Sequence, residues 1–301
     1  MKIGIAITTF NRIEYLIEQI RLIQKFSLNE YELIVCDDGS TDETVDVLNR
    51  EKINYITGKN KGIAWNKNRG IYYLANYTQA DMFILLDDDI FPTMYGWDVE
   101  WAKAAQFYGH VNFIPPEWKY QLLYGDCNAS NPGLSTMLSG PCISINRRIF
   151  PLVGYMDSRF GRYGHEHVEY STRYVKSGFG GIVRNNGTIV YFVIDSGLKL
   201  ISIPTTGTPE DIEANKKILL SIQEESILYR LPWSSEIEKK NFLNDFKNKN
   251  QIVHLKEWDI IREFDQDFYL ETYPDVKAAG INPVQHYILY GCKENRKIKP
   301  E

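Results

Sequence analysis

A short apolar run that ends in three consecutive carboxylates constrains this chain more than any other segment. Residues 83–86 are apolar, and Asp87, Asp88 and Asp89 follow directly. An apolar run of this length, bounded by polar residues, predicts a buried strand. The three acids cannot be buried without partners, because each unpaired buried charge costs several kcal/mol. They must therefore face water or bind a cation, and hard oxygen ligands of this kind suit Mn²⁺ or Mg²⁺.

The segments around this run alternate between strand and helix patterns. In order, the sequence predicts strand 3–7, helix 12–26, strand 32–36, helix 41–48, strand 53–56, helix 62–77 and strand 83–86. Such alternation predicts an α/β fold, a mostly parallel sheet flanked by helices. Later predicted elements are helix 96–108, strand 138–145, helix 165–176 and strand 188–194.

The composition changes between residues 204 and 209, where Thr, Gly and Pro gather. Beyond this point charged and apolar positions alternate, which predicts helices over residues 210–263. We therefore predict an α/β domain over residues 1–205 and a small α-helical C-terminal region over residues 206–301.

Charge and cysteine usage narrow the class of protein. The formal net charge of −5 argues against a nucleic-acid partner, which normally selects a basic surplus. The four cysteines show no paired spacing, and no apolar stretch approaches the ~20 residues of a membrane span. With no signal-peptide pattern at the start, we expect a cytoplasmic protein. Peripheral contact with a membrane surface stays open.

Several familiar motifs are missing from the sequence. It contains neither the phosphate-binding G-x-x-x-x-G-K-[ST] loop nor a G-x-G-x-x-G loop after the first strand. The run that starts at His165 is similar to a zinc-protease helix, but Glu169 stands where the second histidine would be needed. A nucleotide site of either common type, or a zinc protease, is therefore not expected.

The ends of the predicted strands carry the chemistry. Thr8 and Thr9 follow the first strand, Asp38 follows the second, and the acid triplet follows the fourth. Because the carboxyl ends of parallel strands meet at one edge of a sheet, these side chains should converge there. A carboxylate can accept hydrogen bonds from the N–H groups of a base or the hydroxyls of a ribose. A diphosphate needs a divalent cation or basic residues. The side chains at the strand ends therefore fit a nucleotide-sugar.

Over residues 1–200 the chain resembles a family 2 glycosyltransferase of the GT-A fold, with its Rossmann-like nucleotide-binding half. The resemblance rests on the order of six segments: 8–12, 35–42, 60–62, 68–70, 86–89 and 154–167. It implies a UDP-sugar donor, and donor-binding roles for Thr8, Thr9, Phe10, Arg12, Asp38, Lys61, Arg69, Asp87 and Asp88. Asp89 and Asp87 match the D-x-D motif of the family, which would hold Mn²⁺ or Mg²⁺. His165, His167 and Asp195 are candidates for a third metal ligand.

The resemblance also implies an inverting single displacement with a carboxylate base. Glu166 is the first candidate, because a helix N-terminus keeps a carboxylate ionised. This chain has His167 where the family commonly has an aspartate after the glutamate. Glu169, one turn later on the same face, is the alternative base.

The acceptor would be a glycan or glycoconjugate, as in bacterial polysaccharide biosynthesis. Trp118, Tyr120 and Tyr124 lie in a long irregular segment and could stack against sugar rings; equally, they could pack that segment onto the domain.

Residues 264–300 resemble a short helical module often attached to bacterial glycosyltransferases. It is too small to fold alone, so it should dock on the preceding helices or on a partner protein.

Two other function classes stay open. A sugar-phosphate nucleotidyltransferase would use a similar sheet but usually carries a glycine-rich basic loop after the first strand, and residues 8–11 lack glycine. A non-catalytic GT-A-like scaffold would have no need for the acid triplet or for Glu166.

Overall fold

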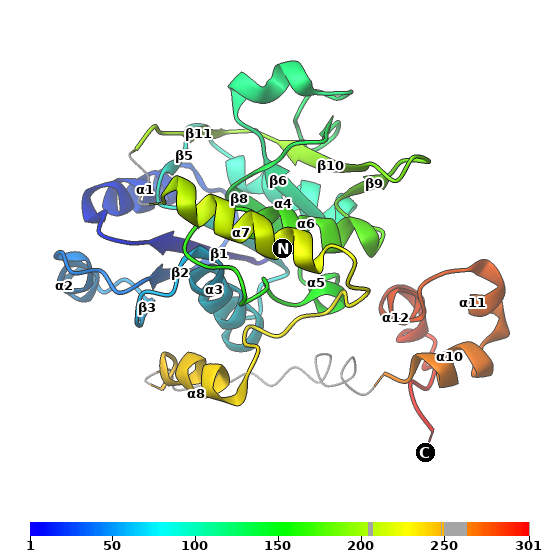
Figure 1. Ribbon diagram of the computed structural model, residues 1–301. Helices are drawn as coiled ribbons and strands as arrows, with labels where there is room; N and C mark the ends of the chain where they lie inside the picture. The colour runs from blue at the N-terminus through cyan, green and yellow to red at the C-terminus, as the bar shows by residue number, and fades with distance from the viewer. Residues whose placement is uncertain (204–206, 248, 250–263, 301) are drawn as a thin grey trace.

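The first part of the chain forms the parallel half of a large sheet. The structure, a computed structural model, describes residues 1–203, 207–247, 249 and 264–300. Strands β1 (Ile3–Thr9), β2 (Tyr31–Asp37), β3 (Tyr55–Thr57) and β4 (Met82–Asp87) lie in the order β3-β2-β1-β4 and run parallel. Helices α1 (Ile13–Phe26), α2 (Thr44–Arg50) and α3 (Ile63–Tyr77) connect them (Figure 1). This half confirms the predicted alternation.

The second half of the sheet is mixed. β8 (Ser139–Asn146) runs antiparallel between β4 and β6 (His110–Phe113), and β10 (Ile189–Ile194) continues the sheet parallel to β6. The short strands β7 (Gly133–Ser135) and β9 (Gly181–Val183) pair antiparallel with β10. The sheet is thus less parallel than the sequence predicts, because the alternation of strand and helix stops after β4.

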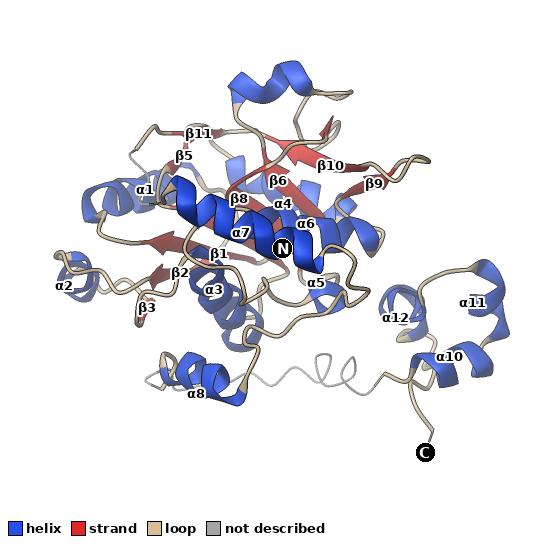
Figure 2. Cartoon of the chain, in the orientation of Figure 1, coloured by secondary structure: helices blue, strands red, loops and turns tan. Residues whose placement is uncertain are grey.

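Short elements complete this part of the molecule. β5 (Ile90–Pro92) and β11 (Leu198–Leu200) form a separate two-stranded ribbon next to the acid triplet. The remaining helices are α4 (Trp97–Tyr108), the 3₁₀ helix η1 (Pro116–Gln121), α5 (Phe150–Val153) and α6 (Glu166–Lys176). Figure 2 shows helices on both faces of the sheet.

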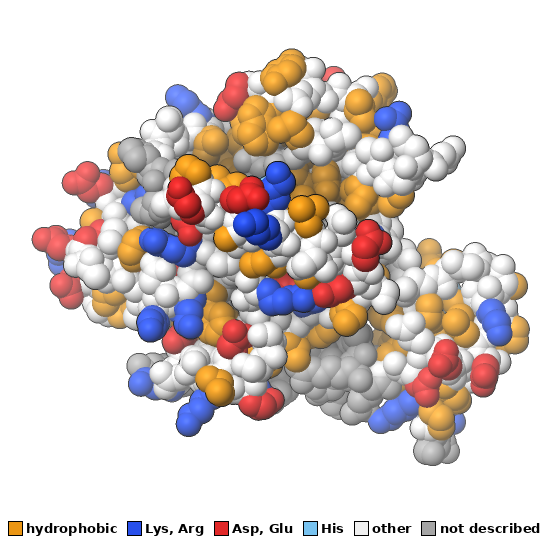
Figure 3. Space-filling model, viewed as in Figure 1, with side chains coloured by type: hydrophobic (Ala, Val, Ile, Leu, Met, Phe, Trp, Pro, Cys, Tyr) orange, Lys and Arg blue, Asp and Glu red, His pale blue; other side chains and the backbone are white. Residues whose placement is uncertain are grey.

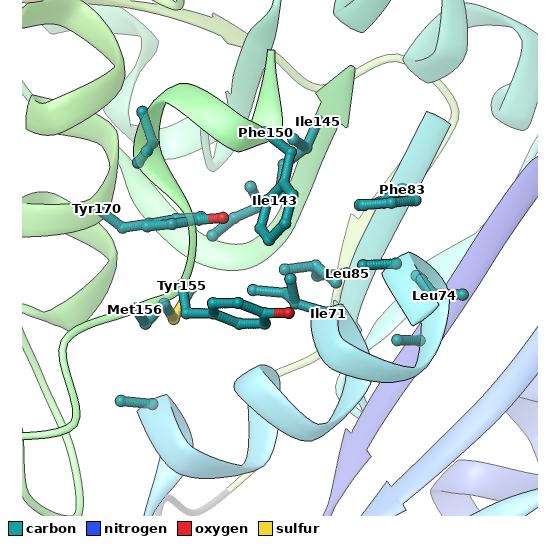
Figure 4. Packing of buried hydrophobic residues seen from close by; sticks show 14 of the residues in the cluster. Ile71, Leu74, Phe83, Leu85, Ile143, Ile145, Phe150, Tyr155, Met156 and Tyr170 are labelled. Atoms are coloured by element: carbon teal, nitrogen blue, oxygen red, sulfur yellow. The ribbon is translucent and has the colours of Figure 1, made fainter. Parts of the chain in front are cut away.

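Each face of the sheet has its own core, because alternate residues of a strand point to opposite faces. Phe83 and Leu85 of β4 pack with α3, α5 and α6, while Ile84 and Leu86 pack with α1 and α4. Figure 4 shows the first cluster, in which Ile71 and Leu74 of α3 face Phe83, Leu85, Ile143 and Phe150. Trp65, Trp97, Trp101, Cys36 and Cys142 are buried.

The C-terminal part is helical. It contains α7 (Pro209–Ile222), α8 (Glu236–Asn244), α10 (Gln266–Thr272), α11 (Pro274–Ala279), α12 (Pro283–His286) and the π-turn η2 (Tyr287–Gly291). Helix was predicted over 210–263; residues 223–235 connect α7 and α8 without forming a helix, and residues 250–263 lie outside the described residues. None of the helices in the described ranges combines the length and apolar character that a bilayer crossing requires.

The C-terminal helices pack onto the first core. Ile222, Phe242 and Phe246 belong to the cluster built by α3, α5 and α6, and Val284 of α12 joins it. Within the last helices, Tyr269 is buried and its hydroxyl lies 3.0 Å from His286 Nδ1. The last helices thus dock on the larger body, while the domain boundary near residue 205 stays a prediction.

Candidate functional site

A cavity of about 430 Å³ opens at the carboxyl edge of the parallel strands. The predicted donor residues at the strand ends line it together: Thr8, Thr9, Phe10, Arg12, Asp38, Asp87, Asp88 and Asp89. They reach one place because β1, β2 and β4 are parallel and in register, with Thr8 opposite both Cys36 and Asp87. The predicted convergence of these strand ends is present in the structure.

Two of the three acids are held by neighbouring side chains. Asp87 accepts a hydrogen bond from Thr8 Oγ1 at 2.7 Å and lies 2.9 Å from Lys67 Nζ. Asp88 is buried and accepts from Thr9 Oγ1 at 2.8 Å and from Arg12 at 2.9 Å. The threonines therefore fix two of the carboxylates that line the cavity.

Asp89 is held differently. Its Oδ1 is buried and has no hydrogen-bond partner among the described residues, and Arg12 is 3.9 Å from its Oδ2. Burial, and then the negative charges of Asp87 and Asp88, raise the pKa of Asp89 to about 7. Asp89 is a carboxylate with too little positive charge near it and two other carboxylates beside it. A divalent cation would neutralise this negative charge, so Asp89 and Asp87 fit the predicted metal ligands.

The predicted third metal ligand is not found. The part of the chain that the structure describes contains no group of three His, Cys, Asp or Glu side chains arranged to hold a metal ion. Asp195 is paired with Lys119 at 2.6 Å, and His167 lies 3.1 Å from Glu166. His165, which directly precedes α6, has a backbone in the left-handed region. A cation held by two carboxylates would take its other ligands from water and phosphate, which is the usual habit of Mg²⁺.

Asp38 is fixed by donors from three directions. It accepts hydrogen bonds from the backbone N–H groups of Lys61 (3.1 Å) and Gly62 (2.9 Å) and from Arg69 at 2.8 Å. Burial raises the pKa of Asp38, and the charge of Arg69 opposes that shift. The carboxylate is thus pre-positioned at the cavity wall.

Arg69 and Lys61 do not line this cavity, although both were predicted to contact the donor. The Arg69 side chain is fully buried and bridges Asp38 to Asp245, 3.0 Å away on the turn after α8. The Lys61 ammonium lies over the ring of Trp65, 5.6 Å from its centroid. In this structure Arg69 contacts Asp38 and does not reach the cavity itself.

The candidate base Glu166 is the first residue of α6 and is buried. One oxygen lies 3.1 Å from His167 Nδ1, and Oε2 finds no hydrogen-bond partner within the described ranges. Burial alone would raise the pKa of Glu166, but the hydrogen bond from His167 and the charges of His167 and Lys67 outweigh it, so the pKa lies below its usual value. Glu166 therefore favours the ionised form, and its buried Oε2 receives no hydrogen bond from the described residues.

The alternative base, Glu169, is already neutralised. It is 2.7 Å from Arg173 and 3.2 Å from Arg230, and Arg173 donates to both of its oxygens. A carboxylate so engaged is a structural element, so the geometry favours Glu166 over Glu169.

Lys67 was missed from the sequence. Its side chain is fully buried, pairs with Asp87 and donates to the carbonyl of Gly140 at 2.6 Å. It lies four residues after Ile63 and four before Ile71, on the face of α3 that packs against the sheet. A lysine in an apolar helix face is the signal that could have identified it.

The predicted acceptor aromatics divide into two kinds. Trp118 packs against a small cluster that includes Ile114 and Val193, so it holds its segment onto the sheet. Tyr120 and Tyr124 are 81% and 69% exposed. The ion pair between Lys119 and Asp195 ties the same segment to the end of β10. The two tyrosines are thus presented to solvent from an anchored segment.

Comparison with known proteins gives a consistent result. The sequence profile described as Glycosyl transferase family 2 matches residues 4–116. A GalNAc(5)-diNAcBac-PP-undecaprenol beta-1,3-glucosyltransferase of Campylobacter jejuni is 30% identical over 117 residues, which are 36% of this chain and 37% of that protein. Chondroitin synthase of Escherichia coli is 30% identical over 74 residues, 23% of this chain and 11% of the enzyme. The chain thus spans little more than a third of the first of these relatives.

Among solved structures, a mannosyltransferase from Pyrobaculum calidifontis in complex with GDP-Man and Mn²⁺ has a TM-score of 0.52 at 12% identity. The match covers 97% of this chain and 86% of that one. At this identity the likeness concerns the fold. Together, the profile match over residues 4–116 and the likeness in fold support a glycosyltransferase of family 2 with a GT-A fold.

Proposed function

We propose that this protein transfers a sugar from a UDP-sugar to a hydroxyl group of a glycan or glycosylated acceptor, with the help of a divalent cation. The observation that carries the proposal is the shared cavity, in which the fixed Asp38 and the under-compensated Asp89 face one space. The names of the relatives support a glycosyl transfer, and the Mn²⁺ in the mannosyltransferase complex supports a metal.

The donor would lie along the strand ends. Asp38 offers a carboxylate to base or ribose donors, and Phe10 lies on the same wall. Asp89 and Asp87 would hold Mn²⁺ or Mg²⁺, which when bound supplies positive charge for the diphosphate. Lys67 and Arg12 hold Asp87 and Asp88 in place by charged hydrogen bonds, so the carboxylates keep their positions as the donor binds.

Glu166 would be the base. Its free Oε2 accepts the proton of the acceptor hydroxyl while that oxygen bonds to the anomeric carbon and the bond to the diphosphate breaks, with inversion. His167 holds the other oxygen, and this histidine packs against Gly140, where a Cβ would lie 2.9 Å from the ring. Because Ser139 and Pro141 line the donor cavity, Glu166 and His167 stand beside its wall.

The acceptor would meet the exposed tyrosines. Tyr120 and Tyr124 offer aromatic faces of the kind that stack on sugar rings, from a segment anchored by Trp118. The cytoplasmic location and a protein partner for residues 264–300 stay predictions.

The test is nucleotide release from a panel of UDP-sugars and GDP-mannose with Mn²⁺, for the wild type and Asp89→Ala. We expect release with at least one UDP-sugar, and its loss in the variant. Asp46→Ala, at an exposed position on α2, is the matched control and should keep full activity. Retained turnover in Asp89→Ala would reject the metal role. Release of pyrophosphate from a sugar phosphate and a nucleoside triphosphate would instead identify a nucleotidyltransferase.

A further inference from the structure

A second cavity, of about 770 Å³, lies between β3 and α8. The described residues that line it come from β3, the loop after it, α3, the end of α8 and the residues directly after α8. No residue of the described chain lines both cavities. In the loop between them, Lys59 and Lys61 line the second cavity while Asn60 and Gly62 line the first. This loop therefore separates the two cavities, and alternate residues of it line each one.

The second cavity is strongly basic, although the chain as a whole carries a net charge of −5. Its lining contains four lysines and Arg69 against one carboxylate, Asp245, and that carboxylate is already paired with Arg69. Within the described ranges, Lys59, Lys61 and Lys247 have no salt bridge. In Figure 3, Lys and Arg side chains lie on the surface near the positions that β3 and α8 occupy in Figure 1.

A network of buried hydrogen bonds holds one side of this cavity in place. Arg69 is fully buried and bonded to Asp245, Asp38 and the carbonyl of Lys59. Gly58 leaves room for this arrangement, because a Cβ there would lie 2.5 Å from Arg69 Nη2 and from Asp245 Oδ2. The lysines around it thus surround a rigid centre.

A buried donor at the same place lacks an acceptor. Trp65 is only 5% exposed, it lines the cavity, and its Nε1–H has no hydrogen-bond partner among the residues described. A buried N–H without an acceptor is costly, so native structures rarely leave one. Lys249 also lines the cavity; its ammonium group donates a hydrogen bond to Asn54 Oδ1, and burial lowers its pKa. An oxyanion would supply the acceptor that the Trp65 N–H lacks and would favour the charged form of Lys249.

We propose that this cavity binds a phosphate or diphosphate group. The ammonium groups of Lys59, Lys61 and Lys247 supply charge, and the indole N–H of Trp65 and the side-chain amides of Asn241 and Asn244 supply hydrogen-bond donors. Among the described residues these three ammonium groups form no salt bridge, and three such charges match a multiply charged oxyanion better than a single carboxylate. A phosphate also has enough oxygens for several donors at once. The inference does not depend on the transferase activity, because the donor cavity contributes none of these residues.

The experiment is calorimetric titration of the full chain with inorganic pyrophosphate. EDTA is present, so that a metal-dependent diphosphate site contributes no heat. We expect one pyrophosphate per chain. The double variant Lys59→Gln/Lys247→Gln should bind at least about tenfold more weakly, since two charged contacts are lost. Lys240→Gln is the matched control, because Lys240 is exposed on the same helix and does not line the cavity. It should bind like the wild type, and so should Asp89→Ala.

The result that overturns the proposal is absence of binding, unchanged affinity in the double variant, or loss of binding in Asp89→Ala. Both substituted lysines are exposed, so thermal melting should show folded variants; if the double variant does not fold, Lys59→Gln alone serves. Co-sedimentation with phosphatidylcholine vesicles containing phosphatidylglycerol separates the sources. Co-sedimentation that the double variant loses would assign a lipid phosphate, and pyrophosphate binding without co-sedimentation would assign a soluble one.

Discussion

Arg69 donates a hydrogen bond to Asp38 at 2.8 Å while its Nε donates to Asp245 at 3.0 Å, from a fully buried position. One guanidinium thus neutralises two carboxylates, and only Asp38 faces the donor cavity. The relationship makes the C-terminal region part of the support for a residue near the start of the chain.

Replacing this guanidinium should strongly reduce the stability of the folded protein. In Arg69→Ala both carboxylates lose their partner in a buried place, and breaking a buried ion pair in this way costs about 3–5 kcal/mol. We expect the free energy of unfolding, measured by urea denaturation, to fall by that amount. Arg21→Ala, at an exposed site on α1, is the control and should change it by less than about 0.5 kcal/mol. Equal stabilities of the two variants would contradict the bridging role.

Lys67 should act on donor binding. Removing its charge in Lys67→Met leaves Asp87 without its cation, and a hydrogen bond to a charged group contributes about 1.5–3 kcal/mol. We expect the KM for the donor to rise about tenfold or more in the UDP-release assay. Lys103→Met, exposed on α4, should leave KM unchanged. A normal KM in Lys67→Met would show that Asp87 does not need this partner.

The two candidate bases can be distinguished by whether their replacement lowers kcat or the melting temperature. Glu166→Gln keeps the size of the side chain but cannot accept the proton, so kcat should fall by about 10²–10⁴ with the melting temperature nearly unchanged. Glu169→Gln weakens the pairs with Arg173 and Arg230, so its main effect should be a lower melting temperature. The reverse pattern would assign the base to Glu169.

Stability should fall with acid partly because of His110. Burial lowers the pKa of His110 to about 3, from 6.5 in an exposed histidine. Between these values the unfolded chain binds the proton and the folded chain does not, so stability decreases as pH falls from 6.5 towards 3, by up to about 1.4 kcal/mol per pH unit for this one group.

His110→Phe tests this contribution. The ring can stay stacked on Tyr174, whose centroid is 4.2 Å away, but it no longer titrates. The variant loses the contact with Ser171 and should be less stable at neutral pH, while its stability should depend less steeply on pH between about 4 and 6.5. The check is a set of urea denaturation curves across that range. Parallel pH profiles for the two proteins would show that His110 does not contribute.

The sequence predicts the donor half of the molecule well for a physical reason. Strands β1 and β4 are apolar on both faces, and Thr8, Thr9 and the acid triplet mark their ends. The nearby sequence therefore predicts both the strands and the sheet edge at which they end. The antiparallel direction of β8 cannot be predicted in this way, because its apolar pattern is the same in either direction.

The misplaced side chains have long-range causes. Arg69 was predicted to contact the donor, but its second partner, Asp245, lies 176 residues away, and no local pattern marks that contact. Lys67 was overlooked because lysine usually lies on a surface. Trp118 and Tyr120 are two residues apart in η1, yet only Trp118 is packed, because its side chain meets the cluster that includes Val193 of β10.

The packing of Phe242 and Phe246 into the first core has a practical consequence for anyone shortening this protein. A gene trimmed to its first 205 codons would still encode Asp38, Arg69 and the whole acid triplet. The product would nevertheless expose an aromatic seam along α3 and leave a guanidinium with half of its counter-charge. The smallest polypeptide that keeps this part of the molecule intact therefore ends no earlier than Phe246.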